Sequence, residues 1–344
     1  METHRKLIPD ACQSLKAFNI DSLDADAKKE IIEAVFFPYT EFDSATITFP
    51  DDEKVLFTSK MLRSPKNLDT NREYTSIGDL TKVPNEIMVQ IIVDLDIRTL
   101  WSFALVNRHA RELVISLPGY KLVVKKFPEI LMALFRTKVG ILKSVTLADV
   151  ISILQPHETP YCQGGDCHQI GSFVFLPTLQ RCCWRCLQHS DNFHVYTEGL
   201  YFRWRPWKSG PGADIQTLPG KYGDSQHVFR ARRFLVHRDS HPYDTYDYAM
   251  SANRAKREYP YMCAIRVGLV DPKSSLRNAK ILPGVCCAGC HEMPIPDDLD
   301  GKAKEELYDC KRQVYLEFGS LGCYYLDHFK WCAAAQNLWN EKLE

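Results

Sequence analysis

Apolar side chains recur at three- and four-residue steps between residues 83 and 117, which predicts short amphipathic helices there. Asp96 and Asn107 each precede a further apolar run, as expected for the N-caps of a second and a third helix. A unit of about 40 residues is below the size at which an isolated core is comfortably stable, so we expect a partner to cover its apolar surface. The stripe of the first helix consists of Val83, Ile87, Met88, Ile91, Ile92 and Leu95.

The flanking segments have weaker patterns. Residues 24–35 predict a short helix, residues 37–56 alternate in places as a strand would, and residues 59–76 are polar and favour a linker. A helical pattern continues over residues 120–154, where Pro128 is expected to break or kink it. Aromatic and β-branched residues predict strands over residues 195–240, and helical patterns return over residues 246–262 and 302–338.

Composition narrows the function classes. The chain has 344 residues, 45% of them hydrophobic, with 43 lysines and arginines against 43 aspartates and glutamates. Zero net charge argues against a globally basic nucleic-acid binder. We find neither a signal peptide nor a stretch of about 20 apolar residues, so we expect a cytoplasmic or nuclear protein without a membrane segment. In such a reducing compartment, 13 cysteines point to metal rather than disulfides.

Five cysteines lie within residues 162–186, arranged as two groups about 15 residues apart. This spacing is typical of a structural zinc site, because four thiolates supply soft tetrahedral ligands. The competing interpretation is that these cysteines are small buried hydrophobic residues. The predicted ligands are Cys162, Cys167, Cys183 and Cys186.

Two details refine this first site. The pair Gly164-Gly165 can turn the backbone tightly between the first two ligands. Cys182 and Cys183 cannot readily bind one ion together, and Cys183 is preferred because Cys-x-x-Cys makes the tight turn. His168 remains a possible substitute ligand.

A second and looser set lies near the C-terminus. His328 and Cys332 are four residues apart and would share one helix face, while Cys310 and Cys323 are rival partners. Both sites would be structural, since a closed site with four ligands leaves no position for a substrate. The predicted ligands of the second site are Cys287, Cys290, His328 and Cys332.

The segment from Leu80 to Phe127 resembles an F-box. The matching positions are a hydrophobic-Pro-x-Glu-Ile opening, an Ile-Ile-x-x-Leu continuation, a leucine in the second helix and a Val-Asn-Arg turn into the third. The resemblance implies that the helices dock on a Skp-type adaptor, which bridges to cullin. The side chains assigned to that interface are Leu80, Val83, Pro84, Ile87, Ile91, Leu95, Leu100 and Val106.

The stretch after this segment is similar to a set of fungal F-box proteins. Their Phe-Leu-Pro-Thr…Arg-Cys-Cys-x-x-Cys-Leu pattern is matched here between Phe175 and Leu187. This second resemblance implies a eukaryotic, fungal source and no known activity.

A basic and aromatic stretch at residues 201–240 offers the competing function. Such a mix could bind single-stranded nucleic acid, although a twisted sheet with one aromatic and one basic face is favoured. The aromatic residues concerned include Tyr201, Phe202, Trp204 and Trp207.

We therefore expect an α+β chain in three parts. Residues 1–75 form a partly disordered N-terminal segment, residues 76–127 the F-box, and residues 128–344 a cysteine-rich substrate-recruiting domain stapled by one or two zinc ions. The predicted function is that of a non-catalytic substrate-recognition subunit of a Skp-cullin-F-box ubiquitin ligase, with an unidentified protein substrate. The alternative is a zinc-dependent nucleic-acid-binding or regulatory protein.

Overall fold

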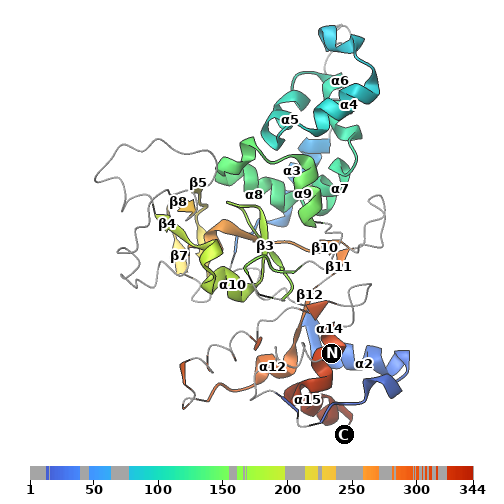
Figure 1. Cartoon of the computed structure of the whole chain (residues 1–344), viewed down its shortest axis with the longest axis vertical. Helices are drawn as coiled ribbons and strands as arrows, with labels where there is room; N and C mark the ends of the chain where they lie inside the picture. The colour runs from blue at the N-terminus through green and yellow to red at the C-terminus, as the bar shows by residue number, and fades with distance from the viewer. Residues whose placement is uncertain are drawn as a thin grey trace.

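Helices and small antiparallel sheets alternate along the chain, which gives an α+β architecture (Figure 1). No helix in the described part of the chain is long and apolar enough to span a membrane. The computed structural model describes residues 13–14, 16–38, 46–62, 77–154, 161–165, 167, 169–197, 214–223, 227–237, 259–270, 281–282, 284–296, 298, 300–301, 304, 307, 310–311, 315–316 and 324–343.

The N-terminal region contains two helices and one short strand. The predicted first helix is α2 (Ala25–Val35), whose N-cap Asp24 accepts a 2.8 Å hydrogen bond from the amide of Ala27. Strand β1 (Phe36–Pro38) follows directly. Helix α3 (Asp51–Leu62) then occupies residues for which alternation and a linker were predicted. Three acidic residues in its first turn complement the helix dipole, a local signal that outweighs the weak alternation.

Three short helices follow in close succession, where the apolar pattern predicts them. They are capped as expected: Asp96 accepts a hydrogen bond from the amide of Thr99, and Asn107 accepts one from the amide of Ala110. Pro84 lies at the N-cap of the first helix, one position before the start of the helix. The helices are α4 (Asn85–Val93), α5 (Ile97–Ala104) and α6 (Arg108–Ser116), preceded by the 3₁₀ turn η4 (Gly78–Lys82).

The next helices pack beneath these three. Pro128 breaks the helical pattern as expected, because α7 ends before it and α8 begins at it. Gly119 turns the chain between α6 and α7 with φ at +78°, a conformation that favours glycine. The bounds are α7 (Tyr120–Lys126), α8 (Pro128–Thr137), η5 (Gly140–Lys143) and α9 (Leu147–Leu154).

The strands are short and form several small sheets. One sheet has the order β3-β2-β9, another β4-β8-β5 and a third β1-β12-β13, while β6-β7 and β10-β11 are two-stranded. Strands β4 to β8 confirm the prediction for the described parts of residues 195–240, while Tyr201, Phe202, Trp204 and Trp207 lie outside the described residues. The bounds are β2 (Phe173–Phe175), β3 (Gln180–Cys182), β4 (Val195–Thr197), β5 (Asp214–Gln216), β6 (Gly220–Tyr222), β7 (His227–Phe229), β8 (Phe234–His237), β9 (Ala264–Arg266), β10 (Leu269–Val270), β11 (Ile281–Leu282), β12 (Gly284–Cys287) and β13 (Tyr315–Leu316).

Sequence patterns are less informative about the last third of the chain. Most of the helix predicted at residues 246–262 lies outside the described residues, and its described end is the 3₁₀ turn η10 (Tyr261–Cys263), which leads into β9. Helices α14 and α15 confirm the later part of the helical pattern predicted over residues 302–338, but strand β13 lies within that range, where the prediction is wrong. The bounds of these two helices, with those of the shorter helices of this half, are α10 (Trp184–His189), η6 (Asp191–Phe193), α12 (Ala288–Glu292), α14 (Tyr324–Trp331) and α15 (Ala333–Leu343).

Two separate clusters of buried side chains form the core. The larger cluster joins helices α3 to α10 to the sheets around β2 and β9. The smaller cluster lies near both chain ends, where α2 and β1 pack against α12, α14 and α15 (Figure 1). Strand β12 belongs to both, with Cys286 in the larger core and Cys287 in the smaller one. Successive side chains of a strand point to opposite faces, so β12 couples the two cores.

Candidate metal centres

Two groups of cysteine and histidine side chains converge in the described part of the chain. Within each group, the ligand atoms all lie within 4.8 Å of one another. The groups contain the eight residues predicted from the sequence, and each is compatible with one metal ion. Site 1 consists of Cys162, Cys167, Cys183 and Cys186, and site 2 of Cys287, Cys290, His328 and Cys332.

The first half of site 1 is a tight loop. A β-bridge between Tyr161 and Ile170 closes this loop and presents Cys162 and Cys167. Gly165 lies in the loop with φ at +105°, so the predicted glycine turn is confirmed. The amide of Gly164 donates a hydrogen bond to the sulfur of Cys162 at 3.4 Å. This amide therefore helps to hold the first ligand.

The second half of site 1 is a strand that leads into a helix. Cys183 follows β3 and caps α10, where its sulfur accepts a hydrogen bond from the amide of Cys186 at 3.4 Å. The sulfur of Cys167 lies 3.5 Å from that of Cys183, so the two halves meet. A Cβ atom at Gly164 would lie 2.7 Å from the Cβ of Cys186, and only glycine allows this approach.

The choice between the adjacent cysteines is resolved by the strand. Cys182 is the last residue of β3, pairs with Phe173 and is fully buried in the larger core. Cys183 lies beyond the strand and joins site 1 instead. The geometry is therefore compatible with Cys183, the preferred ligand, and places Cys182 outside the cluster. The substitute ligand His168 lies outside the described residues.

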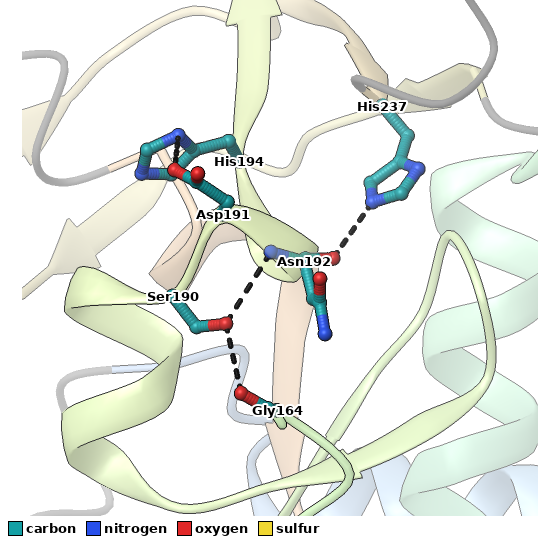
Figure 2. Close-up of polar contacts among 6 residues, drawn as sticks. All are labelled: Gly164, Ser190, Asp191, Asn192, His194 and His237. Atoms are coloured by element: carbon teal, nitrogen blue, oxygen red, sulfur yellow. Dashed lines mark hydrogen bonds and ion pairs between the residues drawn. The ribbon is translucent and has the colours of Figure 1, made fainter. Parts of the chain in front are cut away.

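Polar contacts fasten site 1 to the neighbouring sheet (Figure 2). The Ser190 hydroxyl donates to the carbonyl of Gly164 at 3.1 Å and accepts from the amide of Asn192 at 3.3 Å. The carbonyl of Asn192 in turn lies 2.9 Å from Nε2 of the buried His237, on β8. A weaker contact of 3.4 Å joins His194 to Asp191 on the same turn. The chain of contacts links the first loop, the end of α10 and β8.

Site 2 gathers its ligands from the junction of β12 with α12, from α14 and from the residue between α14 and α15. Cys287 caps α12, and its sulfur accepts a hydrogen bond from the amide of Cys290 at 3.4 Å. The sulfur of Cys290 lies 3.4 Å from Nε2 of His328 and 3.4 Å from the sulfur of Cys332. His328 lies on α14, while Cys332 precedes α15 and accepts a hydrogen bond from the amide of Ala335. The sequence predicts His328 and Cys332 on one helix face; Cys332 instead follows the last residue of α14, and its sulfur still lies close to the ring of His328.

The two sites share a local unit that sequence reasoning did not identify. In each, a strand ends in Cys-Cys-x-x-Cys, the middle cysteine caps a short helix, and the last cysteine lies in its first turn. The first cysteine of each motif, Cys182 or Cys286, is buried in the larger core. The repeated Cys-Cys-x-x-Cys was the available signal for this duplication.

A fifth sulfur adjoins site 2. Cys310 is buried, and its sulfur lies 3.5 Å from that of Cys290. It is not one of the four residues whose ligand atoms are all mutually close. Of the two rival partners considered from the sequence, Cys310 thus lies beside site 2, and Cys323 lies outside the described residues.

The ligand groups of each site shift one another's pKa values. In site 1, hydrogen bonding with Cys162 raises the pKa of Cys183 and of Cys186. Hydrogen bonds from Cys162, Cys183 and Cys186 lower the pKa of Cys167. In site 2, burial opposes the charged form of His328, but the sulfurs of Cys287 and Cys332 outweigh it and raise its pKa to about 10. The Cys332 thiol has a lowered pKa because Cys287 and Cys290 donate to its thiolate. A metal cation would replace the protons that these groups share.

The side chains assigned to an adaptor interface divide into three groups by exposure. Leu80, Ile87, Ile91 and Val106 are 45–67% exposed, and Pro84 is exposed as well. Val83 and Leu95 are partly buried against the larger core. Leu100 is only 2% exposed, so it is a core residue of this fold and offers no free surface. Leu100 is buried because the face of α5 that carries it packs against the larger core of the same chain.

No family model, curated protein or solved structure matches this chain.

Proposed function

We propose that this protein is a zinc-stapled substrate receptor of F-box type, which tethers a target protein to a Skp-cullin ubiquitin ligase. The helices α4 to α6 would bind the adaptor, and the remainder of the chain would present the target. Its contribution to the reaction is proximity alone, since it holds the target near the ubiquitin-conjugating enzyme.

The observation that carries this proposal is the exposed apolar face of α4. Ile87 and Ile91 are one helical turn apart and are 46% and 50% exposed, while Met88 and Ile92 on the adjoining face are buried. Ordinary surface helices place such β-branched side chains inside. Fully burying each of the two would contribute about 1.5–3 kcal/mol, which suits helix-in-groove recognition of a partner.

The position of these helices supports the same proposal. Figure 1 shows α4, α5 and α6 at one end of the molecule, with the smaller core near both termini at the other end. An adaptor bound at α4 would leave the middle of the chain accessible to a target.

We propose zinc for both metal centres. Four sulfur ligands, or three sulfurs and one imidazole, in a closed buried set are what zinc prefers in structural sites. In this role zinc contributes to folding and takes no part in chemistry.

The test is adaptor binding by the full-length chain. Replacing Ile87 and Ile91 together by Arg should weaken binding to a purified Skp-type adaptor by at least about 100-fold, because two buried anchors are lost. Val228→Arg is the matched control, because Val228 is a β-branched side chain of similar exposure, 53%, but lies on β7, away from α4. Unchanged binding in the double variant, with the melting temperature preserved, would remove the proposal.

Salt separates this function from the nucleic-acid alternative. Adaptor binding driven by apolar burial should survive high salt, whereas phosphate binding weakens steeply as counterions compete. The protein should therefore retain the adaptor and bind single-stranded oligonucleotides weakly. Tight, salt-sensitive oligonucleotide binding without adaptor binding would favour the alternative.

A further inference from the structure

Two neighbouring pockets lie between α3, α8 and the small sheets. The first has a volume of about 430 Å³ and is bordered by the start of α3, the end of α8 and strand β6. The second has a volume of about 520 Å³ and is bordered by α3, α7, α8 and strands β9 and β11. Thr48 and Phe49 line both pockets and so form the wall between them. An extended ligand could occupy both pockets.

Positive charge dominates the first pocket. Its lining contains Arg136, Lys221 and Arg232 against a single carboxylate, that of Glu53. Arg136 is held by an ion pair with Glu53 and lies over the ring of Phe49 at 5.1 Å. The other two cations remain to attract an anionic group.

One of those two cations, Arg232, is held in place by neutral groups. Nη1 of Arg232 donates to the backbone carbonyl of Arg136 at 3.2 Å and to Oε1 of Gln216 at 3.3 Å. These acceptors orient the guanidinium without neutralising it. Lys221 is exposed on β6. Together they present two positive charges to a ligand in the pocket.

The second pocket repeats this imbalance. Its lining contains Lys54, Lys126 and Arg266 against Glu129. Lys54 pairs with Asp51 at 2.6 Å, outside the lining. The two pockets together therefore carry more positive than negative charge, which concentrates anionic ligands near them.

A buried hydroxyl is a separate indication of a ligand. Thr46 lines the first pocket and is 1% exposed, and its Oγ1 has no hydrogen-bond partner among the described residues. Buried polar groups are nearly always paired in native proteins, and a missing ligand or water is a usual explanation where they are not.

We propose that the two pockets form a docking groove for an acidic peptide segment, whose carboxylates bind between Lys221 and Arg232 in the first pocket. That this segment belongs to the recruited target rests on the function proposed above. The aromatic side chains disfavour nucleic acid, because Phe49 lies beneath Arg136 and Tyr222 is 3% exposed, so neither ring is free to stack on a base. The carboxylate of Glu53 further disfavours a doubly charged phosphate over a carboxylate.

The test uses the full-length protein and a fluorescein-labelled oligoglutamate peptide, with binding followed by anisotropy at low salt. The parent should bind, and affinity should fall as salt is added. Lys221→Glu combined with Arg232→Glu should weaken binding by at least about tenfold, since two attractions become repulsions. Lys221→Gln and Arg232→Gln, which only remove charge, should have smaller effects in the same direction.

Arg230→Glu is the matched control, because Arg230 is exposed near the same strands but lines neither pocket. Three results would overturn the proposal: no oligoglutamate binding by the parent, equal weakening by Arg230→Glu, or tighter binding of a phosphoserine peptide or a single-stranded oligonucleotide at the same residues. Adaptor binding should be unchanged in the Lys221 and Arg232 variants, so failure of this groove and failure of the adaptor assignment are distinguishable.

Discussion

Sites 1 and 2 are built from the same strand-to-helix unit, yet they lie in different surroundings. Site 1 takes all its ligands from residues 162–186, and three of them, Cys162, Cys183 and Cys186, belong to the larger core, which contains many other buried side chains. Site 2 joins ligands from residues 287–332 inside the smaller core, where its cysteines are themselves part of the buried cluster. A metal at site 1 would fasten a loop onto an existing core. A metal at site 2 would tie α12 to α14 and to the start of α15, the helix against which α2 packs.

The largest effect is therefore expected at site 2. Cys290→Ser removes the sulfur that contacts both His328 and Cys332. Structural zinc contributes on the order of 10 kcal/mol to the folding of small domains, so we expect the smaller core to unfold. Zinc per chain should fall by one ion, and amide exchange should accelerate in α2 and α15 but not in α8.

Cys310→Ser is the control for that substitution. Cys310 is buried beside Cys290 but lies outside the mutually close set. It should keep both metals and lose only a modest amount of stability. If Cys310→Ser releases zinc while Cys290→Ser retains it, then Cys310 and not Cys290 is a ligand of site 2.

A smaller effect is expected at site 1. Cys183→Ser should release that zinc and loosen the loop around Gly164, while the larger core stays folded because its helices do not depend on the ion. Cys182→Ser should keep the metal and cost about 1–3 kcal/mol, since it buries a hydroxyl in an apolar environment. Zinc content and thermal melting of both variants measure the difference. The reverse pattern would exchange the roles of the two cysteines.

Local chemistry explains why so much could be predicted from the sequence. The caps Asp24, Asp96 and Asn107 act within three residues of themselves, and the ligand pairs of both sites are close in sequence. The antiparallel pairing of β1 with β12 could not be predicted, because strands of three and four residues carry no usable period and the two strands are far apart in the chain. The burial of Leu100 depends on which face of α5 meets the rest of the chain.

The pockets and the close glycine contacts could not be predicted from the sequence for a similar reason. The charged pockets around Thr48 combine side chains from distant segments, which no local motif encodes. The sequence predicts the turn at Gly164-Gly165, but the close approach of Gly164 to Cys186 and of Gly289 to Ala334 depends on how the helices pack.

The next prediction compares Gly289, beside site 2, with Gly164, beside site 1. A Cβ atom at Gly289 would lie 2.5–2.7 Å from backbone atoms of Ala334 and Ala335, whereas one at Gly164 would meet the side chain of Cys186. Backbone atoms can move aside less easily than a side chain, so Gly289→Ala should lower the free energy of unfolding more than Gly164→Ala. We expect both losses to be about 1–3 kcal/mol, the usual cost of overpacking. Gly301→Ala is the control, because its Cβ would meet open space. Melting temperature and the rate of zinc loss to a chelator measure the order, and equal effects at all three glycines would contradict it.

The smallest effect is expected where the two sites are made chemically alike. His328→Cys would give site 2 four sulfur ligands, as in site 1, and zinc accepts either set. The metal should therefore be retained, with a loss of about 1–2 kcal/mol, because the smaller side chain no longer fills the space beside Phe36. Cobalt-substituted protein provides the measurement, since one more thiolate per chain should strengthen the sulfur-to-cobalt charge-transfer absorption. His328→Ala, which offers no ligand, should instead lose the ion and behave like Cys290→Ser. If His328→Ala keeps full metal content and an unchanged cobalt spectrum, then His328 is a buried neighbour of the metal, and Cys310, whose sulfur already lies 3.5 Å from that of Cys290, is the fourth ligand.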